Sequence, residues 1–180
     1  MLKVINEYPC GVKLLKVPYF DDERGVFCKF YNSVLFEKNN INFSPKEHFY
    51  SISKKNVLRG MHFQIREASH TKLISCIAGE IIDVVVDIRK DSKFFNKPLS
   101  FNLSSFSKTA VLIPRGFAHG FLSISEESIV QYLVSKPYDA NLDKGVKWDS
   151  IDFDWPCSSP LISDRDNKHP SIYSQEFIFE

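Results

Sequence analysis

The stretch of this chain that decides its fold class is Ile81-Ile82-Asp83-Val84-Val85-Val86-Asp87-Ile88, the most β-prone run in the sequence. The run is too short for most helices, and its β-branched residues favour an extended backbone. Turn-forming residues bound it, since Ala78-Gly79-Glu80 precedes it and Arg89-Lys90-Asp91-Ser92 follows it. We therefore expect a β-strand here, with a turn at either end.

Further short segments with strand-like composition lie on both sides of this run. The N-terminal part, up to residue 31, reads as strand pieces with a turn at residues 21–25. The other segments that we expect to be extended are residues 26–31, 48–53, 72–76, 110–113, 121–124 and 129–134. Many short strands separated by turns indicate a sandwich or barrel rather than a βαβ sheet.

The helices expected in this chain are few and short. Residues 32–40 fit one short helix with Asn32 or Ser33 as its cap. Ser163 is placed to cap a helical turn that contains Asp166. From Pro137 onward Asp, Asn, Trp and Pro dominate and regular alternation fades. We therefore expect residues 137–180 to form an irregular lid with short helical turns.

Composition limits the function classes open to this chain. At 180 residues it fits one domain, residues 1–180, and can bury most of its apolar surface. The 23 basic and 22 acidic residues give a net charge of +1, which argues against broad attraction to nucleic acids or membranes. The first residues lack a signal-peptide core, and no apolar run approaches the roughly 18 residues of a membrane span. The four cysteines are widely spaced, so we expect reduced thiols in a cytoplasmic protein.

Two stretches carry side chains suited to chemistry, and we expect them to be walls of one pocket. They are Val57-Leu58-Arg59-Gly60-Met61-His62-Phe63-Gln64 and Pro114-Arg115-Gly116-Phe117-Ala118-His119-Gly120-Phe121. Histidine exchanges protons near neutral pH, and arginine binds phosphate through a planar fork of donors. In a regular strand His62 points away from Arg59, so both reach one pocket only if Gly60 disturbs the alternation.

Each candidate residue also has a plain structural interpretation. His62 and His119 can be interpreted as core histidines with a satisfied hydrogen bond. Arg59 and Lys72 can be interpreted as solvated surface charges. Tyr132 shares a strand face with apolar neighbours and fits core packing, while Asp166 fits a helix-turn cap.

A metal site is not expected from this sequence. Barrel-type metal enzymes carry a His-x-His pair followed by a carboxylate, and this chain has no His-x-His. The sequence also lacks a glycine-rich phosphate loop and a nucleophile-elbow pattern around a Ser or Cys. We therefore expect neither a metal nor another cofactor.

Five motifs follow one another along the chain over roughly residues 9 to 170. They are Asp22-Glu23-Arg24-Gly25, Lys54-Lys55-Asn56-Val57-Leu58-Arg59-Gly60-Met61-His62-Phe63-Gln64, Gly79-Glu80 with Asp83-Val84-Val85-Val86-Asp87-Ile88-Arg89, Ile113-Pro114-Arg115-Gly116-Phe117-Ala118-His119-Gly120-Phe121, and Ser163-Asp164-Arg165-Asp166. Together they resemble the signature of the dTDP-4-dehydrorhamnose 3,5-epimerase family. The resemblance implies an all-β cupin fold, a double-stranded β-helix related to the jelly roll, with a few short helices and an irregular C-terminal segment. It also implies a homodimer without a metal.

The resemblance implies an epimerase of a nucleotide-diphosphate 4-keto sugar in polysaccharide precursor synthesis. The C4 carbonyl acidifies the hydrogens on C3 and C5, so removing one gives an enolate, and reprotonation on the opposite face inverts the centre. This chemistry needs a base, an acid on the other face, and a cation or donor at the C4 oxygen. By resemblance His62 is the base and Asp166 its partner, Tyr132 is the acid, and Lys72 is the cation. The residues that by resemblance hold the diphosphate and the sugar are Arg24, Arg59, His119, Tyr138 and Arg165.

Two departures from the family pattern bear on the nucleotide. Where thymidine-specific members carry a Glu this chain has Lys29, and where they carry Gln-Asp-Asn it has Glu47-His48-Phe49. In the relatives these positions contact the nucleotide and sugar. An ammonium in place of a carboxylate reverses what the position attracts, and a lost amide removes donors and acceptors for a base edge. The sequence therefore leaves open dTDP, GDP or CDP as the nucleotide, a 6-deoxyhexose or heptose as the sugar, and C3, C5 or both as the inverted centre.

Two other functions use the same scaffold. A sugar-nucleotide 3,4-ketoisomerase moves the carbonyl between C4 and C3 by related acid–base chemistry, but the complete Arg-Gly-Met-His and Ala-His-Gly motifs speak against it. A non-catalytic carbohydrate-binding cupin predicts a degraded set of catalytic residues, whereas all four types are present here.

Overall fold

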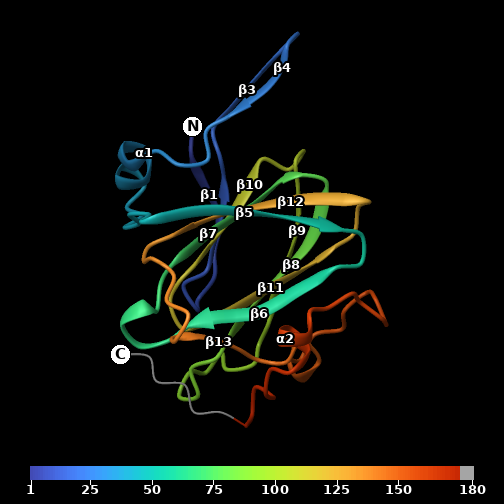
Figure 1. The fold of residues 1–180 in the computed structure, drawn as a ribbon. Coiled ribbons are helices and arrows are strands. Elements are labelled where there is room, and N and C mark those ends of the chain that lie inside the picture. The colour runs from blue at the N-terminus through green and yellow to red at the C-terminus, as the bar shows by residue number, and fades with distance from the viewer. Residues whose placement is uncertain (175–180) are drawn as a thin grey trace.

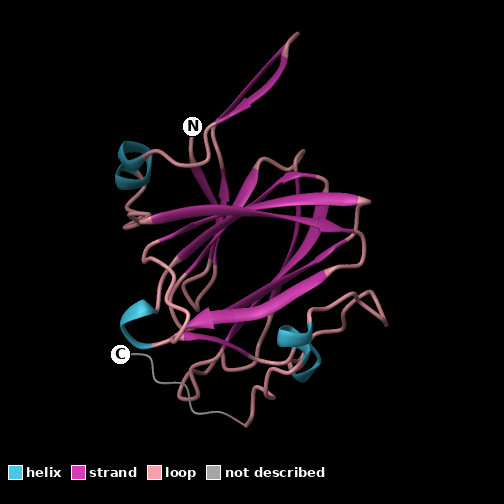
Figure 2. Cartoon of the chain, in the orientation of Figure 1, coloured by secondary structure: helices cyan, strands magenta, loops and turns pink. Residues whose placement is uncertain are grey.

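Two antiparallel sheets face each other in the computed structural model, which describes residues 1–174 (Figure 1). The strands of the six-stranded sheet, in spatial order, are β1 (Lys3–Glu7), β2 (Lys13–Lys16), β10 (Thr109–Ile113), β7 (Lys72–Ala78), β12 (Glu127–Val134) and β5 (Glu47–Lys54). Those of the five-stranded sheet are β13 (Asp143–Gly145), β6 (Leu58–Gln64), β11 (Phe117–Ser123), β8 (Glu80–Asp87) and β9 (Leu99–Ser104). Strands dominate the cartoon of Figure 2, which confirms the expected all-β fold.

The β-prone run at residues 81–88 lies within β8, between β11 and β9. Its side chains alternate between two apolar layers: Ile81 and Val85 join the core between the sheets, and Val84 and Val86 join a layer on the outer face. A strand that is covered on both faces needs apolar residues at nearly every position. That requirement explains why this run lacks the polar alternation of a half-exposed strand.

Three apolar layers hold the fold together. The first fills the space between the sheets and includes Val12, Ile74 and Phe121. The second lies under the N-terminal segment and the first helix, around Phe36. The third joins the outer face of the five-stranded sheet to residues 146–172, and Met61 lies in it. Both sheets are therefore covered on both faces, at least in part.

The short helices follow the expected caps. In α1 (Ser33–Lys38) the Asn32 side chain accepts a hydrogen bond from the Leu35 N–H. In α2 (Asp164–Asn167) the Ser163 Oγ accepts from the Asp166 N–H at 3.1 Å. The described part of the chain also contains two single 3₁₀ turns, η1 (Arg66–Ala68) and η2 (Trp148–Ser150). Both capped helices that the sequence predicted are confirmed.

The C-terminal segment is irregular and contains short helical turns, as expected, but most of it does not form a lid. Most of it packs on the outer face of the five-stranded sheet, through Val146, Ile151 and Ile172, rather than over a pocket. It also contains β13, which pairs with β6 opposite His62 and which the sequence did not predict. Asp143-Lys144-Gly145 has no strand-forming side chains, so only the pairing with β6 makes it extended. The last part of the predicted segment, residues 175–180, lies outside the described residues.

One hairpin projects from the rest of the molecule (Figure 1). It consists of β3 (Tyr19–Asp22) and β4 (Gly25–Cys28), which within residues 1–174 pair only with each other. Phe20 and Phe27 lie side by side on it, with 69% and 60% of their surface exposed. The turn was predicted, but its projection was not. We call residues 19–28 the arm.

The structure bears on two expectations from composition, the absence of a membrane-spanning helix and the state of the cysteines. No helix within residues 1–174 has the length and apolar character to cross a membrane. All four cysteines are free thiols, and the Sγ of Cys76 donates to backbone carbonyls.

Candidate active site

A cavity of about 320 Å³ lies between the two sheets. Its walls are β5, β7 and β12 of one sheet and β6 and β11 of the other. The site residues predicted from sequence that line it are Glu47, Phe49, Arg59, His62, Lys72, His119, Tyr132, Tyr138 and Arg165. The two histidine stretches that were expected to share a pocket therefore do so.

A bulge in β6 brings Arg59 and His62 to the same cavity. His62 pairs with His119 and Arg59 pairs with Phe121, so two residues of β6 face one residue of β11. The extra residue disturbs the strict alternation of a strand. Gly60 permits the bulge, because its φ is +144° and an added Cβ would lie 2.6 Å from the Gly120 Cα. The predicted role of this glycine is confirmed.

His62 and Asp166 form a hydrogen-bonded pair. His62 Nε2 lies 2.9 Å from Asp166 Oδ1, and Asp166 Oδ2 accepts from the Gly60 N–H at 3.1 Å. The capped first turn of α2 holds the carboxylate beside β6. Arg165 Nη2 also approaches His62 Nε2, at 2.8 Å, and its Nη1 pairs with Asp143 at 2.9 Å.

The environment sets the protonation of this pair. Burial lowers the pKa of His62 below its ordinary value, and Asp166 opposes that shift only in part. Burial alone would raise the pKa of Asp166, but hydrogen bonds from His62, Gly60 and Arg165 hold it well below its usual range. At neutral pH the pair is therefore a neutral imidazole beside a carboxylate, which suits a general base.

Tyr132 faces the cavity from the opposite sheet. Its ring stacks on Phe49, with centroids 4.7 Å apart and planes 12° apart, and meets His119 edge to face at 6.0 Å. Burial raises the pKa of the Tyr132 phenol, so this group keeps its proton through the neutral range. A protonated phenol that is buried in the wall of the cavity is suited to donate a proton.

Lys72 supplies a cation close to the base. Its Nζ donates to the His62 carbonyl at 3.0 Å. Burial lowers the pKa of Lys72 to about 8, although Asp143 and Asp83 favour the charged form. The ammonium is therefore charged at pH 7 and buried in the wall of the cavity, where a charge acts strongly on a developing oxyanion.

His119 belongs to a second, fully buried pair. Its Nε2 lies 2.6 Å from Oδ1 of Asp83, and both side chains are almost inaccessible to solvent. Asp83 comes from the β-prone run, where it is one of two carboxylates in an apolar strand. Burying a charged side chain costs free energy unless the charge is paired. The position of Asp83 in an apolar strand was therefore a signal for a buried partner, which the sequence analysis missed.

Other residues at the site were also missed. His70, Gln64, Ser51 and Asp143 line the cavity. His169 lies against the dyad, with its ring centroid 5.7 Å from that of His62. His70 and His169 sit in loops, where no alternation indicates which way a side chain points.

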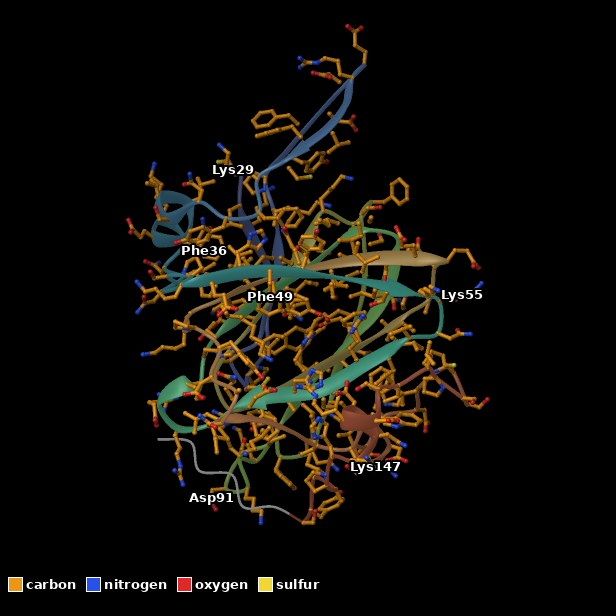
Figure 3. All side chains as sticks on the ribbon, viewed as in Figure 1. Lys29, Phe36, Phe49, Lys55, Asp91 and Lys147 are labelled. Carbon is orange, nitrogen blue, oxygen red and sulfur yellow. The ribbon has the colours of Figure 1, made fainter. Side chains whose placement is uncertain are left out.

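Three predicted contacts are not assembled within one chain. Arg24 lies on the arm, where its guanidinium pairs with Asp22, and it does not line the cavity. Lys29 follows the arm and is exposed, and Figure 3 labels it there, apart from Phe49 on β5. His48 is exposed because it alternates with Glu47 and Phe49, which face the cavity. Their roles in substrate binding stay predictions.

The arrangement matches the needs of carbon-acid chemistry. A neutral imidazole and a protonated phenol line one cavity from opposite sheets, and an ammonium lies beside the imidazole. Such a set can remove a proton from a carbon next to a carbonyl, stabilise the enolate and return a proton from another direction.

Comparison with known proteins identifies the family. A family model described as dTDP-4-dehydrorhamnose 3,5-epimerase matches residues 10–174. A relative of that description from Shigella flexneri is 38% identical over 182 residues, covering 98% of this chain and 97% of the relative. A structure from Bacillus anthracis with TDP and PPi bound has a TM-score of 0.91 and 37% identity, covering 95% of this chain and 99% of that one. A structure from Legionella pneumophila in complex with dTDP-4-keto-L-rhamnose has a TM-score of 0.93 and 28% identity, covering 100% and 99%. This chain therefore belongs to the dTDP-4-dehydrorhamnose 3,5-epimerase family and is an epimerase of nucleotide-linked 4-keto sugars.

Proposed function

We propose that His62 and Tyr132 invert C3, C5 or both in the 4-keto sugar, in a reaction that needs no metal. The observation that carries this assignment is that both side chains line one cavity from opposite sheets. A sugar bound between them presents one face to the imidazole and another to the phenol. Inversion requires that the proton leave one face and return on the other.

In the first step neutral His62 takes the proton from C3 or C5. The C–H electron pair moves toward C4, and the C4 oxygen becomes an enolate oxyanion. Asp166 stabilises the resulting imidazolium, since its carboxylate already lies 2.9 Å from Nε2. Lys72 offers a positive charge to the oxyanion.

In the second step the Tyr132 O–H protonates the carbon from the other face. Because burial keeps the pKa of this phenol above its ordinary value, the phenol enters the step with its proton in place. Solvent then restores the proton of Tyr132 and removes that of His62. Phe49 and His119 fix the orientation of the ring that must deliver the proton.

The diphosphate and sugar need cations and donors at the rim of the cavity. Arg59 is oriented by Ser53, whose Oγ accepts from Nε at 2.9 Å. Arg165 contacts His62 Nε2, which cannot both accept from Arg165 and donate to Asp166. When the dyad takes the form needed for catalysis, the Arg165 guanidinium is released to bind the diphosphate. Tyr138, which is exposed, is placed to contact the sugar.

We further propose a homodimer in which the arm of one chain reaches the cavity of the other. An isolated two-stranded hairpin is marginally stable in water, and this arm exposes Phe20 and Phe27. Docking on a second copy buries these rings and carries Arg24 and Lys29 to a substrate. This arrangement reconciles the predicted contacts of Arg24 with its position outside its own cavity.

The substrate that we propose is a dTDP-linked sugar, and residues 1–180 act as one catalytic domain in the cytoplasm. The identity of this chain to relatives described as acting on dTDP-4-dehydrorhamnose supports the nucleotide. The four free thiols support the compartment.

Exchange of carbon-bound hydrogen tests the reaction. The enzyme is incubated in heavy water with dTDP-, GDP- and CDP-linked 4-keto-6-deoxy sugars, and NMR follows the C3 and C5 hydrogens and the product. We expect deuterium at C3, C5 or both, with inversion, for the dTDP sugar. Retention of hydrogen in all three sugars would refute the proposal, and a product with its carbonyl at C3 would indicate a ketoisomerase instead.

A further inference from the structure

Three potential metal ligands meet beside the cavity, where His62 forms part of its wall. They are His62, Asp166 and His169, and their ligand atoms all lie within 4.8 Å of one another. Asp166 Oδ1 is central, since it lies 2.9 Å from His62 Nε2 and 3.7 Å from His169 Nε2. Two imidazoles and one carboxylate form a ligand set that Zn²⁺ accepts, with the fourth position left to water.

The spacing of these atoms is close to what one Zn²⁺ requires. Bond lengths of about 2.0–2.1 Å in a tetrahedral site place ligand atoms roughly 3.3 Å apart. The two measured separations, 2.9 and 3.7 Å, lie on either side of that value. Since no two of the three ligand atoms are more than 4.8 Å apart, rotations of the side chains can bring them around one ion.

His169 has no other evident use for its ring nitrogen. Its Nε2 is buried and has no hydrogen-bond partner among the described residues. The ring lies so close to Gly145, which pairs with His62, that an added Cβ there would collide with it. An unpaired buried polar atom costs about 1–3 kcal/mol, so a ligand for this nitrogen would remove a real penalty.

We propose that His62, Asp166 and His169 form a binding site for Zn²⁺, and that the ion inhibits the enzyme by occupying the catalytic base. With Zn²⁺ on Nε2, the hydrogen of the neutral imidazole lies on Nδ1, so His62 keeps no free lone pair to accept a proton from the sugar. The ion is thus a reversible blocker and has no part in epimerisation. Binding is independent of the proposed reaction, whereas inhibition rests on it.

Arg165 is the group that opposes the ion. Its Nη2 lies 2.8 Å from His62 Nε2 and its Nε lies 3.2 Å from Asp166 Oδ1, so a cation already occupies the side of the dyad that the metal would use. The guanidinium must move away before Zn²⁺ binds. Removing it should therefore strengthen metal binding, whereas removing His169 should weaken it.

Metal binding is measured first, without substrate. The full chain is titrated with Zn²⁺ by calorimetry, and with Co²⁺ by visible absorption, which reports tetrahedral coordination. We expect one ion per chain, at least tenfold weaker binding in His169→Ala and His169→Gln, and tighter binding in Arg165→Gln. The exposed His48 supplies the control: His48→Ala should bind as the wild type does. Melting temperatures check that each variant is folded, and the glutamine variant retains most of the side-chain volume if the alanine variant does not fold.

Two results would overturn this proposal. One is the absence of stoichiometric binding to the wild-type chain, and the other is equal Zn²⁺ affinity in the wild type and in both His169 variants. Inhibition is then measured by hydrogen exchange, with recovery after addition of a chelator, and an unchanged exchange rate with Zn²⁺ bound would overturn the inhibitory role. If the chain binds Zn²⁺ as expected but exchanges no hydrogen in any substrate, the proposed reaction fails while the metal site stands.

Discussion

His62 and Tyr132 line one cavity from opposite sheets of the molecule, the first on β6 and the second on β12. The bulge in β6 turns His62 toward the cavity, and the Tyr132 ring stacks on Phe49. Proton removal and proton return are thereby assigned to different walls. The predictions below depend on this separation.

The pH dependence of kcat/KM should be bell-shaped. The acidic limb reports His62, whose pKa lies below its ordinary value because it is buried, so activity rises as His62 loses its proton. The alkaline limb reports Lys72, whose pKa of about 8 means that the cation is lost as the pH passes that value. Lys72→Arg keeps a charge at high pH and should remove this limb, whereas Lys72→Met should lower the plateau by about 10²-fold. An alkaline limb that is unchanged in Lys72→Arg would assign it to another group.

Gly60→Ala should disable the site by destroying the bulge. The added methyl group would lie 2.6 Å from the Gly120 Cα, at a residue whose φ of +144° already disfavours a side chain. We expect a loss of more than about 2 kcal/mol in the free energy of unfolding, together with loss of activity. Gly25→Ala is the matched control, because Gly25 also has a positive φ but its Cβ would meet nothing within 4 Å. Equal losses in the two variants, measured by chemical denaturation, would contradict the role of the close approach to Gly120.

Arm exchange predicts complementation between subunits. A homodimer of either Arg24→Ala or His62→Asn is expected to have low catalytic activity at low substrate concentration. In a mixed dimer with exchanged arms, one site receives both wild-type residues, so about half of the wild-type activity should return. Co-expression with two different tags isolates the mixed dimer. If the arms stay with their own chains, each site keeps one defect and no activity returns.

The nucleotide specificity should appear as a difference in thermal stabilisation. A ligand that binds only the folded chain raises its melting temperature by mass action. In a panel of UDP, GDP, CDP and dTDP at equal concentration, we expect the largest shift with dTDP. A larger shift with another nucleotide would contradict the dTDP assignment, and the substitution Lys29→Glu would then test whether Lys29 causes the difference.

Stability should fall between pH 6.5 and 4 because of His70. Burial lowers the pKa of His70 to about 4, whereas an unfolded histidine titrates near 6.5. The unfolded chain therefore binds more protons in this range, so the free energy of unfolding decreases as the pH falls. His70→Gln should flatten that decrease, as measured by melting temperature. Identical pH dependence in the variant would show that His70 is not buried as a neutral ring.

The sequence was sufficient for those parts of the fold that local chemistry determines. The β-prone run became β8, and Asn32 and Ser163 cap the helices that they were expected to cap. The strand β13 was missed because its residues have no strand propensity of their own, and its pairing with β6 is a tertiary effect. The projection of the arm was missed for a related reason. The alternation of apolar and polar residues indicates a hairpin but not whether that hairpin packs on the rest of its own chain.

Within the site, the sequence predicted those residues whose neighbours along a strand indicate which way the side chain points. The need for a disturbance at Gly60 followed from the spacing of Arg59 and His62, and the bulge confirms it. His169 and His70 lie in loops and carried no such signal. Asp83 was visible as a charge in an apolar strand, but its partner His119 is 36 residues away, and only the pairing of β8 with β11 brings them together.

Hydrogen exchange in two variants tests the division of labour most directly. Wild-type enzyme, His62→Asn and Tyr132→Phe are incubated with the 4-keto sugar in heavy water, and NMR follows exchange and inversion separately. We predict that His62→Asn loses both by about 10²–10⁴-fold, since a positioned base contributes that much, while Tyr132→Phe still exchanges hydrogen but inverts far more slowly. Inversion at the wild-type rate in Tyr132→Phe, or exchange at the wild-type rate in His62→Asn, would contradict the account.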